Sequence, residues 1–122
     1  MPDDQQQGPT AVVSRNTAEH YTWGGVCDGW YLLRADDLSV IEERMPPASS
    51  ETRHHHRLST QFFYVLAGVL SIEVEDHQYT LQTGEGIEVH PGQMHQARNV
   101  GHSDLRMLVV SHPPSHDDRV ND

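Results

Sequence analysis

Cysteine is nearly absent: Cys27 is the single one among 122 residues. No disulfide can form within such a chain, so a reducing, cytoplasmic location is expected. The opening residues, M-P-D-D-Q-Q-Q-G-P-T, lack the basic and apolar segments of a signal peptide. No apolar run approaches the ~20 residues of a membrane-spanning helix. We therefore expect no membrane segment, and Cys27 is interpreted as a small buried side chain.

Basic residues are also few. Lys and Arg total 8 against 18 Asp and Glu, which gives a formal net charge of −10 with histidine neutral. A field of this sign repels phosphate backbones and anionic lipid, so we expect neither nucleic acid nor a membrane surface as a partner. To bind an anionic small molecule, this protein would need a local positive site that overcomes the negative net charge. The ten histidines are the compositional outlier, and histidine is the commonest metal ligand.

The sequence also lacks long stretches with helical hydrophobic periodicity, internal repeats and low-complexity segments. Short runs of β-branched and aromatic residues recur instead between Gly, Pro and Asp, which is typical of an all-β sandwich or barrel. Residues 17–23 predict a short helical turn that Gly24 and Gly25 end. A hairpin turn is predicted at Asp76-His77. Strands are predicted over residues 30–33, 38–45, 53–57, 61–67, 69–75, 78–81, 87–90, 95–99 and 105–111.

One domain is expected, because a chain of this length can bury a core without disulfide or metal. We place that domain at residues 13–114. Residues 1–12 are expected to be a flexible N-terminal tail and residues 115–122 a polar C-terminal tail.

The residues from 53 to 68, R-H-H-H-R-L-S-T-Q-F-F-Y-V-L-A-G, carry most of the chemistry. Alternate side chains of an extended strand point to the same face. His54 and His56 should therefore project together, whereas His55 should point away and matter little for a metal.

Two further residues complete a candidate ligand set with His54 and His56. Gln61 opens the apolar run that follows, and His95 comes from the second stretch, G-E-G-I-E-V-H-P-G-Q-M-H-Q-A-R-N. Three imidazoles and one amide oxygen are a plausible set for a divalent metal in the barrel interior. For Gln61 an alternative is that it orients a ligand or a water without touching the metal.

At these residues the sequence resembles the cupin superfamily, and in particular small single-domain bacterial cupins. The first cupin motif, G-x5-H-x-H-x(3–4)-E-x6-G, maps onto Ala48, His54, His56, Gln61 and Gly68. The second, G-x5-P-x-G-x2-H-x3-N, maps onto Gly84, His90, Gly92, His95 and Asn99. The resemblance implies a double-stranded β-helix, also called a jelly-roll barrel, with a metal site at His54, His56, His95 and the position of Gln61.

Three positions depart from the motifs. Ala48 replaces a glycine and His90 a proline, both at backbone positions that the fold can absorb. Gln61 replaces the usual metal-binding glutamate. Glutamine amides serve as ligands in some cupins, so the resemblance implies a metal site without implying one reaction.

The ligand set determines the charge at the metal. Three neutral imidazoles and one neutral amide leave the full +2 on the ion, which favours an anionic ligand and acidifies a bound water. Imidazole suits several metals, so Zn, Fe, Ni, Mn and Cu all remain possible.

Other residues are weaker candidates. Phe63 and Val65 share the parity of Gln61 and should face the interior, whereas Tyr64 should face outward. Glu42 or Glu43, depending on the phase of the strand, should face the cavity as a possible general base.

Surface positions are the simpler interpretation of a second group, His90, Arg57, Arg98 and Arg106, although each arginine could also bind a substrate anion. Trp23, Trp30 and Tyr31 are expected to pack under the barrel or at a dimer interface.

Two functions of different class remain open. The first is a metal-dependent enzyme acting on a small anionic or enolisable molecule, either as a dioxygenase or as an isomerase, lyase or decarboxylase. The second is a non-catalytic cupin that binds a small ligand as a sensor or accessory subunit. In either case the resemblance to small cupins implies a homodimer that pairs through sheet edges and N-terminal strands, and an isolated barrel of this size leaves edges to cover.

Overall fold

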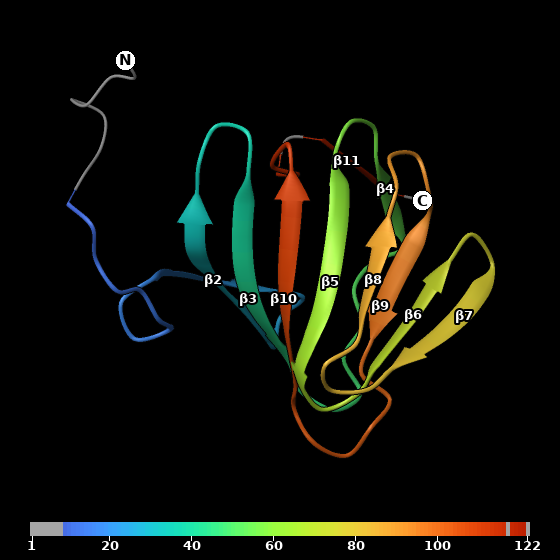
Figure 1. Ribbon diagram of the computed structural model, residues 1–122. Helices are drawn as coiled ribbons and strands as arrows, with labels where there is room; N and C mark the ends of the chain where they lie inside the picture. The colour runs from blue at the N-terminus through green and yellow to red at the C-terminus, as the bar shows by residue number, and fades with distance from the viewer. Residues whose placement is uncertain (1–8, 117, 122) are drawn as a thin grey trace.

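The computed structural model describes residues 9–116 and 118–121, which form two antiparallel sheets that face each other (Figure 1). The strand order is β1-β2-β3-β10-β5-β8 in one sheet and β11-β4-β9-β6-β7 in the other. This is the expected all-β jelly roll. The strands are β1 (Glu19–Trp23), β2 (Cys27–Arg34), β3 (Ser39–Met45), β4 (His54–His56), β5 (Thr60–Ala67), β6 (Leu70–Val74), β7 (His77–Leu81), β8 (Gly86–Val89), β9 (His95–Arg98), β10 (Leu105–His112) and β11 (Arg119–Asn121).

The core lies between the two sheets and follows from strand alternation. In β5 the inward positions Gln61, Phe63 and Val65 are buried, and Phe62 and Tyr64 between them are exposed. This confirms the predicted parity. The other sheet contributes apolar side chains such as Leu70, Ile72 and Ala97, none of which has any exposed surface.

Turn chemistry fixes how the strands connect. Gly68 joins β5 to β6 at a φ of 82°, and a Cβ there would lie 2.5 Å from the carbonyl oxygen of Asp104. Only glycine accepts both the conformation and the close approach. Ala48, at the motif position that usually holds glycine, has a φ of 68°. The departure from the motif therefore places a side chain in the left-handed region, at a cost in strain.

Two local predictions were wrong. Residues 17–23 do not form a helical turn, because Glu19–Trp23 pairs with Cys27–Tyr31 as a hairpin around Gly24 and Gly25. Both glycines have positive φ, as this tight turn requires. The second hairpin turn lies one residue earlier than expected, since Glu75 and Asp76 have positive φ and His77 already begins β7.

The segment expected to be a polar C-terminal tail contains β11, which pairs with β4. Asp118 holds the start of this strand in place. Its carboxylate accepts hydrogen bonds from the backbone amides of Arg57, Leu58 and Ser59 at 3.1, 2.7 and 2.8 Å. The end of the chain is thereby attached to the connection between β4 and β5.

No helix in the described ranges is long and apolar enough to cross a membrane.

Candidate metal centre and its cavity

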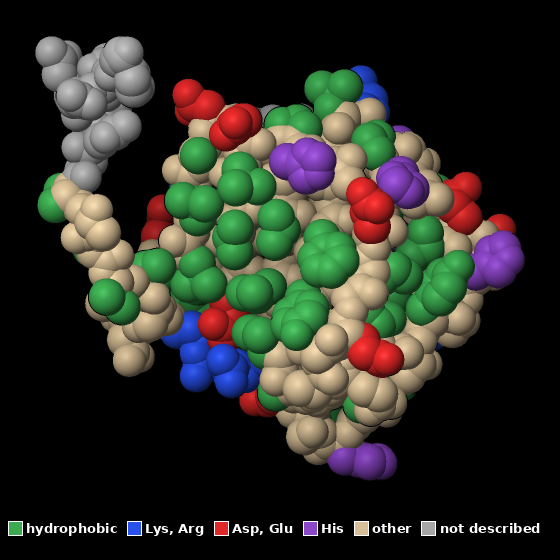
Figure 2. Space-filling view, viewed as in Figure 1, with side chains coloured by type: hydrophobic (Ala, Val, Ile, Leu, Met, Phe, Trp, Pro, Cys, Tyr) green, Lys and Arg blue, Asp and Glu red, His purple; other side chains and the backbone are tan. Residues whose placement is uncertain are grey.

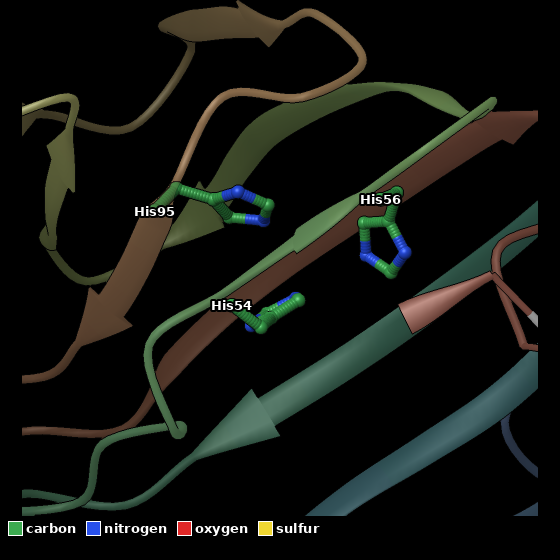
Figure 3. A group of neighbouring side chains, drawn as sticks. All are labelled: His54, His56 and His95. Atoms are coloured by element: carbon green, nitrogen blue, oxygen red, sulfur yellow. The ribbon is translucent and has the colours of Figure 1, made fainter. Parts of the chain in front are cut away.

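Three buried histidines converge between the sheets. His54 and His56 project to the same side of β4, and His95 lies opposite His54 in the register of β4 and β9. One ring nitrogen from each lies within 4.8 Å of those of the other two (Figure 3). Ring centroids are 4.4 Å apart for His54 and His95 and 4.9 Å apart for His54 and His56. The predicted trio is therefore positioned to hold a metal ion.

Hydrogen bonds determine which ring nitrogen of His54 and of His95 is available to bind a metal. Nδ1 of His54 donates to the carbonyl of Thr52 at 2.8 Å, and Nδ1 of His95 donates to the carbonyl of Gln93 at 3.0 Å. A proton on Nδ1 leaves the lone pair on Nε2. Nε2 of His95 is buried and has no hydrogen-bond partner among the described residues. This orphaned acceptor fits a metal ligand.

The charge state of the three rings also fits ligation. Burial lowers the pKa of His54 to about 3 and that of His56 to about 4, and it also lowers the pKa of His95. All three rings are therefore neutral at pH 7, which is the form that binds a metal.

Gln61 lies on the opposing sheet and is 6% exposed. Its amide nitrogen donates to the hydroxyls of Ser111 and Ser115 at 3.1 and 3.4 Å, and its amide oxygen is buried without a partner. In this orientation the amide nitrogen faces the two serines, whose hydroxyls act as acceptors. The unpartnered amide oxygen is the atom that Gln61 would supply as a fourth ligand.

His54 and His56 open onto a cavity of about 290 Å³. Its wall combines aromatic, acidic and basic side chains with the ligand candidates. The lining residues are Tyr21, Trp23, Ile41, Glu43, Glu51, His54, His56, Gln61, Phe63, Val109, Ser115, His116 and Arg119.

Two of these are acids with unusual protonation. Burial and the nearby charge of Glu51 raise the pKa of Glu43 to about 8, against the hydrogen bond to Tyr21 that lowers it. Burial raises the pKa of Glu51 to about 7, against the hydrogen bond from the Ala97 amide. The positive charge of Arg119 lowers both. Each carboxyl can therefore carry or release a proton near neutral pH.

The register of β3 with β10 decides between the two glutamates left open by the sequence. Glu43 faces the cavity, whereas Glu42 lies on the outside of the sheet. There Glu42 accepts hydrogen bonds from Arg106 at 2.9 and 3.1 Å. Arg106 is thus an ion-pair partner of Glu42 and does not line the cavity.

Most of the weaker candidates lie where the simpler interpretation placed them. His55 is outside the histidine cluster, and its Nδ1 lies 3.0 Å from the sulfur of Met94. His90 is exposed next to the turn at Pro91. Arg57 is exposed, and Arg98 is half-buried and does not line the cavity. Cys27 is fully buried.

Sequence reasoning missed four titratable residues of the cavity wall, Tyr21, Glu51, His116 and Arg119. Tyr21 was assigned to a helical turn, and its alternation with Trp23 ahead of Gly24-Gly25 is the signal that could have revealed a hairpin. Glu51 lies in a loop without periodicity. Arg119 and His116 come from the segment taken for a tail, where no pattern indicates a return to the barrel.

Comparison with known proteins agrees with the fold. The family model described as the cupin domain matches residues 28–111. An uncharacterised protein of Methanocaldococcus jannaschii is 30% identical over 81 residues, which are 66% of this chain and 65% of that protein. The polyketide synthase CurC of Streptomyces cyaneus is 30% identical over 69 residues, 57% of this chain and 45% of that protein. The chain thus spans less than two thirds of the length of these relatives.

Among solved structures, the polyketide cyclase RemF from Streptomyces resistomycificus superposes with a TM-score of 0.80 at 21% identity. The match covers 93% of this chain and 85% of that one. At this identity the likeness concerns the fold. Together with the match of the family model over most of the chain, it leads to one conclusion: this protein belongs to the cupin family.

Proposed function

We propose that this protein is a metal-dependent cupin enzyme that abstracts or returns a proton next to the carbonyl group of a small, enolisable molecule. One observation carries the proposal. Three neutral, buried histidines form one cluster, and two of them, His54 and His56, line the same cavity as two carboxyl groups whose pKa values lie near neutrality. A cation site and a proton acceptor that border the same cavity are the two parts that enolisation requires.

His54, His56 and His95 would hold a divalent metal, and Gln61 would supply its amide oxygen as a fourth ligand. A metal bound there acts as a Lewis acid that polarises a carbonyl oxygen. These neutral ligands do not diminish the cation's charge, which favours an anionic substrate despite the chain's net charge of −10. Nitrogen and oxygen donors suit Zn, Fe, Ni, Mn or Cu.

Glu43 is the proposed general base. A carboxylate with a raised pKa is a stronger base than an ordinary one, and a pKa of about 8 is close to the working range of a general acid–base group. The Tyr21 hydroxyl, bonded to Glu43, would orient the carboxyl in both protonation states. Arg119, on the same wall, would attract a carboxylate or enolate of the substrate.

The names of the relatives support a carbonyl substrate. CurC is named as a polyketide synthase and RemF as a polyketide cyclase. The carbonyl groups of a polyketide chain are separated by methylene groups whose carbon–hydrogen bonds are acidic. Such a bond is broken when an enolate forms. The mixed aromatic and polar wall of Tyr21, Trp23 and Phe63 suits a small molecule of this kind.

The test is proton exchange at carbon. The metal-loaded protein is incubated in D₂O with a panel of small ketones that includes levulinate, and loss of the α-proton signals is followed by NMR. We expect exchange that Glu43→Gln and His54→Ala abolish and His55→Ala leaves unchanged. Exchange that survives Glu43→Gln would contradict the assigned base.

Oxygen uptake is measured on the same panel. Consumption of O₂ with cleavage of the ketone would replace the redox-neutral reaction with a dioxygenase reaction. Binding of the ketones without exchange or O₂ uptake would make this protein a ligand-binding cupin and would contradict the proposal.

A further inference from the structure

We propose that a second groove, between the β3–β4 and β9–β10 connections, binds the phosphate group of a small organic molecule at Arg98. This inference does not depend on the proposed reaction, because the groove and the metal cavity have no lining residue in common. Both connections lie at the lower end of the barrel in Figure 1. The groove has a volume of about 510 Å³ and is lined by Pro47, Ala48, Ser49, Ser50, Arg98, Asn99, Val100, Gly101 and His102.

Arg98 has no acidic partner, unlike most arginines of this chain. All eight basic residues are arginines. Figure 2 shows the largest visible group of arginine side chains lying against acidic ones. Among the residues that the structure describes, ion pairs with carboxylates are made by Arg15, Arg34, Arg44, Arg53 and Arg106. Arg98 makes none there, and its Nε is buried without a hydrogen-bond partner.

The surroundings of Arg98 make this unpaired state costly. The side chain is half-buried, and a guanidinium that is partly removed from water without a counter-charge loses solvation that nothing replaces. The chain has 18 acidic residues, yet none of them lines the groove. The groove is therefore a local positive site on a molecule with a net charge of −10, and a bound anion would supply the missing partner.

Strand alternation directs Arg98 away from the metal site. His95 and Ala97 are the buried positions of β9, so Arg98 lies on its opposite face, where its backbone forms a bridge with Ser50. The side chains of Ser50 and His102 are both exposed and line the same groove. A hydroxyl and an imidazole can each donate a hydrogen bond. A guanidinium binds two oxygens of a phosphate at once, and three donor residues suit the three terminal oxygens of a phosphate monoester.

Backbone hydrogen bonds hold the walls of the groove in place. The Ala48 amide donates to the carbonyl of Asn99 at 3.0 Å, and the Asn99 amide donates to the carbonyl of Ser49 at 2.9 Å. The side-chain oxygen of Asn99 accepts a hydrogen bond from the Gly101 amide at 2.9 Å. Ala48 keeps its φ of 68° within this frame, and strained positions of this kind are common at ligand sites. A wall that is already ordered lowers the entropy cost of binding.

The rest of the groove suits an organic group attached to the phosphate. Pro47 and Val100 are exposed apolar side chains of its lining, and Val100 is 64% exposed. A phosphate ion alone fills only a small part of a groove of about 510 Å³. A phosphate monoester would place its charged end on Arg98 and its carbon skeleton on these apolar side chains.

The test is a titration of the full chain followed by two-dimensional ¹H–¹⁵N NMR, with phenyl phosphate and inorganic phosphate as probes. We expect saturable shifts of the Val100 and Gly101 amides, and a Kd at least ~5-fold lower for phenyl phosphate. Arg98→Gln should raise the phenyl phosphate Kd at least ~10-fold. Arg57→Gln is the matched control and should leave the Kd unchanged, because Arg57 is an exposed arginine outside the groove.

A second variant protects the test against misfolding. Ser50→Glu changes an exposed residue and places a carboxylate in the groove, so it should also abolish binding. The dispersion of the NMR spectrum shows that each variant is folded. The proposal is overturned if neither probe shifts the Val100 and Gly101 amides, or if Arg98→Gln binds phenyl phosphate as tightly as Arg57→Gln. Equal Kd values for the two probes would overturn the assignment of an organic phosphate.

Discussion

His54 and His95 lie directly opposite each other on neighbouring antiparallel strands, with ring centroids 4.4 Å apart. They are separated by 41 positions in the sequence, yet each donates its Nδ1 proton to a carbonyl two residues earlier, Thr52 for one and Gln93 for the other. The same kind of local hydrogen bond therefore orients both rings toward a common point. A pair built in this way is preorganised for a metal before any ion arrives.

The charge of the site can be changed at Gln61. Replacing it by glutamate, which has nearly the same shape, should retain the metal and weaken the binding of a small anion such as oxalate by about tenfold or more, because one negative charge would join the ligand set. Isothermal titration calorimetry on the metal-loaded protein measures this. Gln93→Glu, at an amide outside the cavity wall, is the control. Equal oxalate affinity in Gln61→Glu and the unmodified protein would show that this residue does not set the charge of the site.

The two cavity carboxyls predict how stability depends on pH. Folding raises the pKa of Glu43 to about 8 and of Glu51 to about 7, so the folded state holds protons that the unfolded chain releases near pH 4.5. The stabilisation from this proton binding is present at low pH and is lost as the pH rises through 7 to 8. The metal-free protein should become easier to unfold between pH 6.5 and 9.

Glu43→Gln tests this pH dependence. The variant should lose less stability over that pH range than the unmodified protein, by at least about 1 kcal/mol in the free energy of unfolding. Urea titrations at successive pH values provide the measurement. The window begins at 6.5, the ordinary pKa of histidine, and the buried histidines, whose titration has the opposite slope, change the stability mainly below that pH. Parallel pH profiles for the two proteins would mean that Glu43 is already ionised at pH 6.5.

Replacing Ala48 by glycine should stabilise the fold. Its φ of 68° suits glycine, and an alanine there costs more in strain than it saves in unfolded-state entropy. Ala48→Gly should raise the free energy of unfolding by about 1 kcal/mol. Ala97→Gly, in a buried strand, should lower it. A loss of stability in both variants would indicate that the Ala48 methyl group makes contacts that outweigh the strain.

Replacing Asp118 should lower the stability of the fold. Asp118→Ala removes the acceptor of three backbone amides, and it should lower the free energy of unfolding by about 2–3 kcal/mol. Because Asp118 directly precedes β11, the change should also release Arg119 from the cavity wall. Limited proteolysis after Arg119 measures that release. An unchanged cleavage rate would show that β11 is held by its pairing with β4 alone.

How far the sequence predicts this structure depends on whether a residue's neighbours are local. The parity of His54, His55 and His56 follows from strand geometry alone, and the structure confirms it. The glycine motif positions, such as Gly68, indicate turns because few other residues adopt their conformation. These features require no knowledge of the rest of the chain.

The other cavity residues depend on tertiary contacts. Glu43 and Glu42 cannot be distinguished until the register of β3 with β10 is known. Glu51 acquires its raised pKa by burial that no local pattern reveals, and Arg119 reaches the cavity through a strand of three residues in a polar segment. Tyr21 was misassigned because the residues before Gly24 suit either a helical turn or a strand, and pairing with β2 decides between them.

The central claim is tested most directly by the metal content of four proteins purified without added metal and measured by elemental analysis. We expect a divalent metal in the unmodified protein and in His55→Ala, and less than a tenth of that amount in His54→Ala and His95→Ala. Equal metal content in all four proteins, or equal loss in the three variants, would contradict the assignment of these histidines as a metal site.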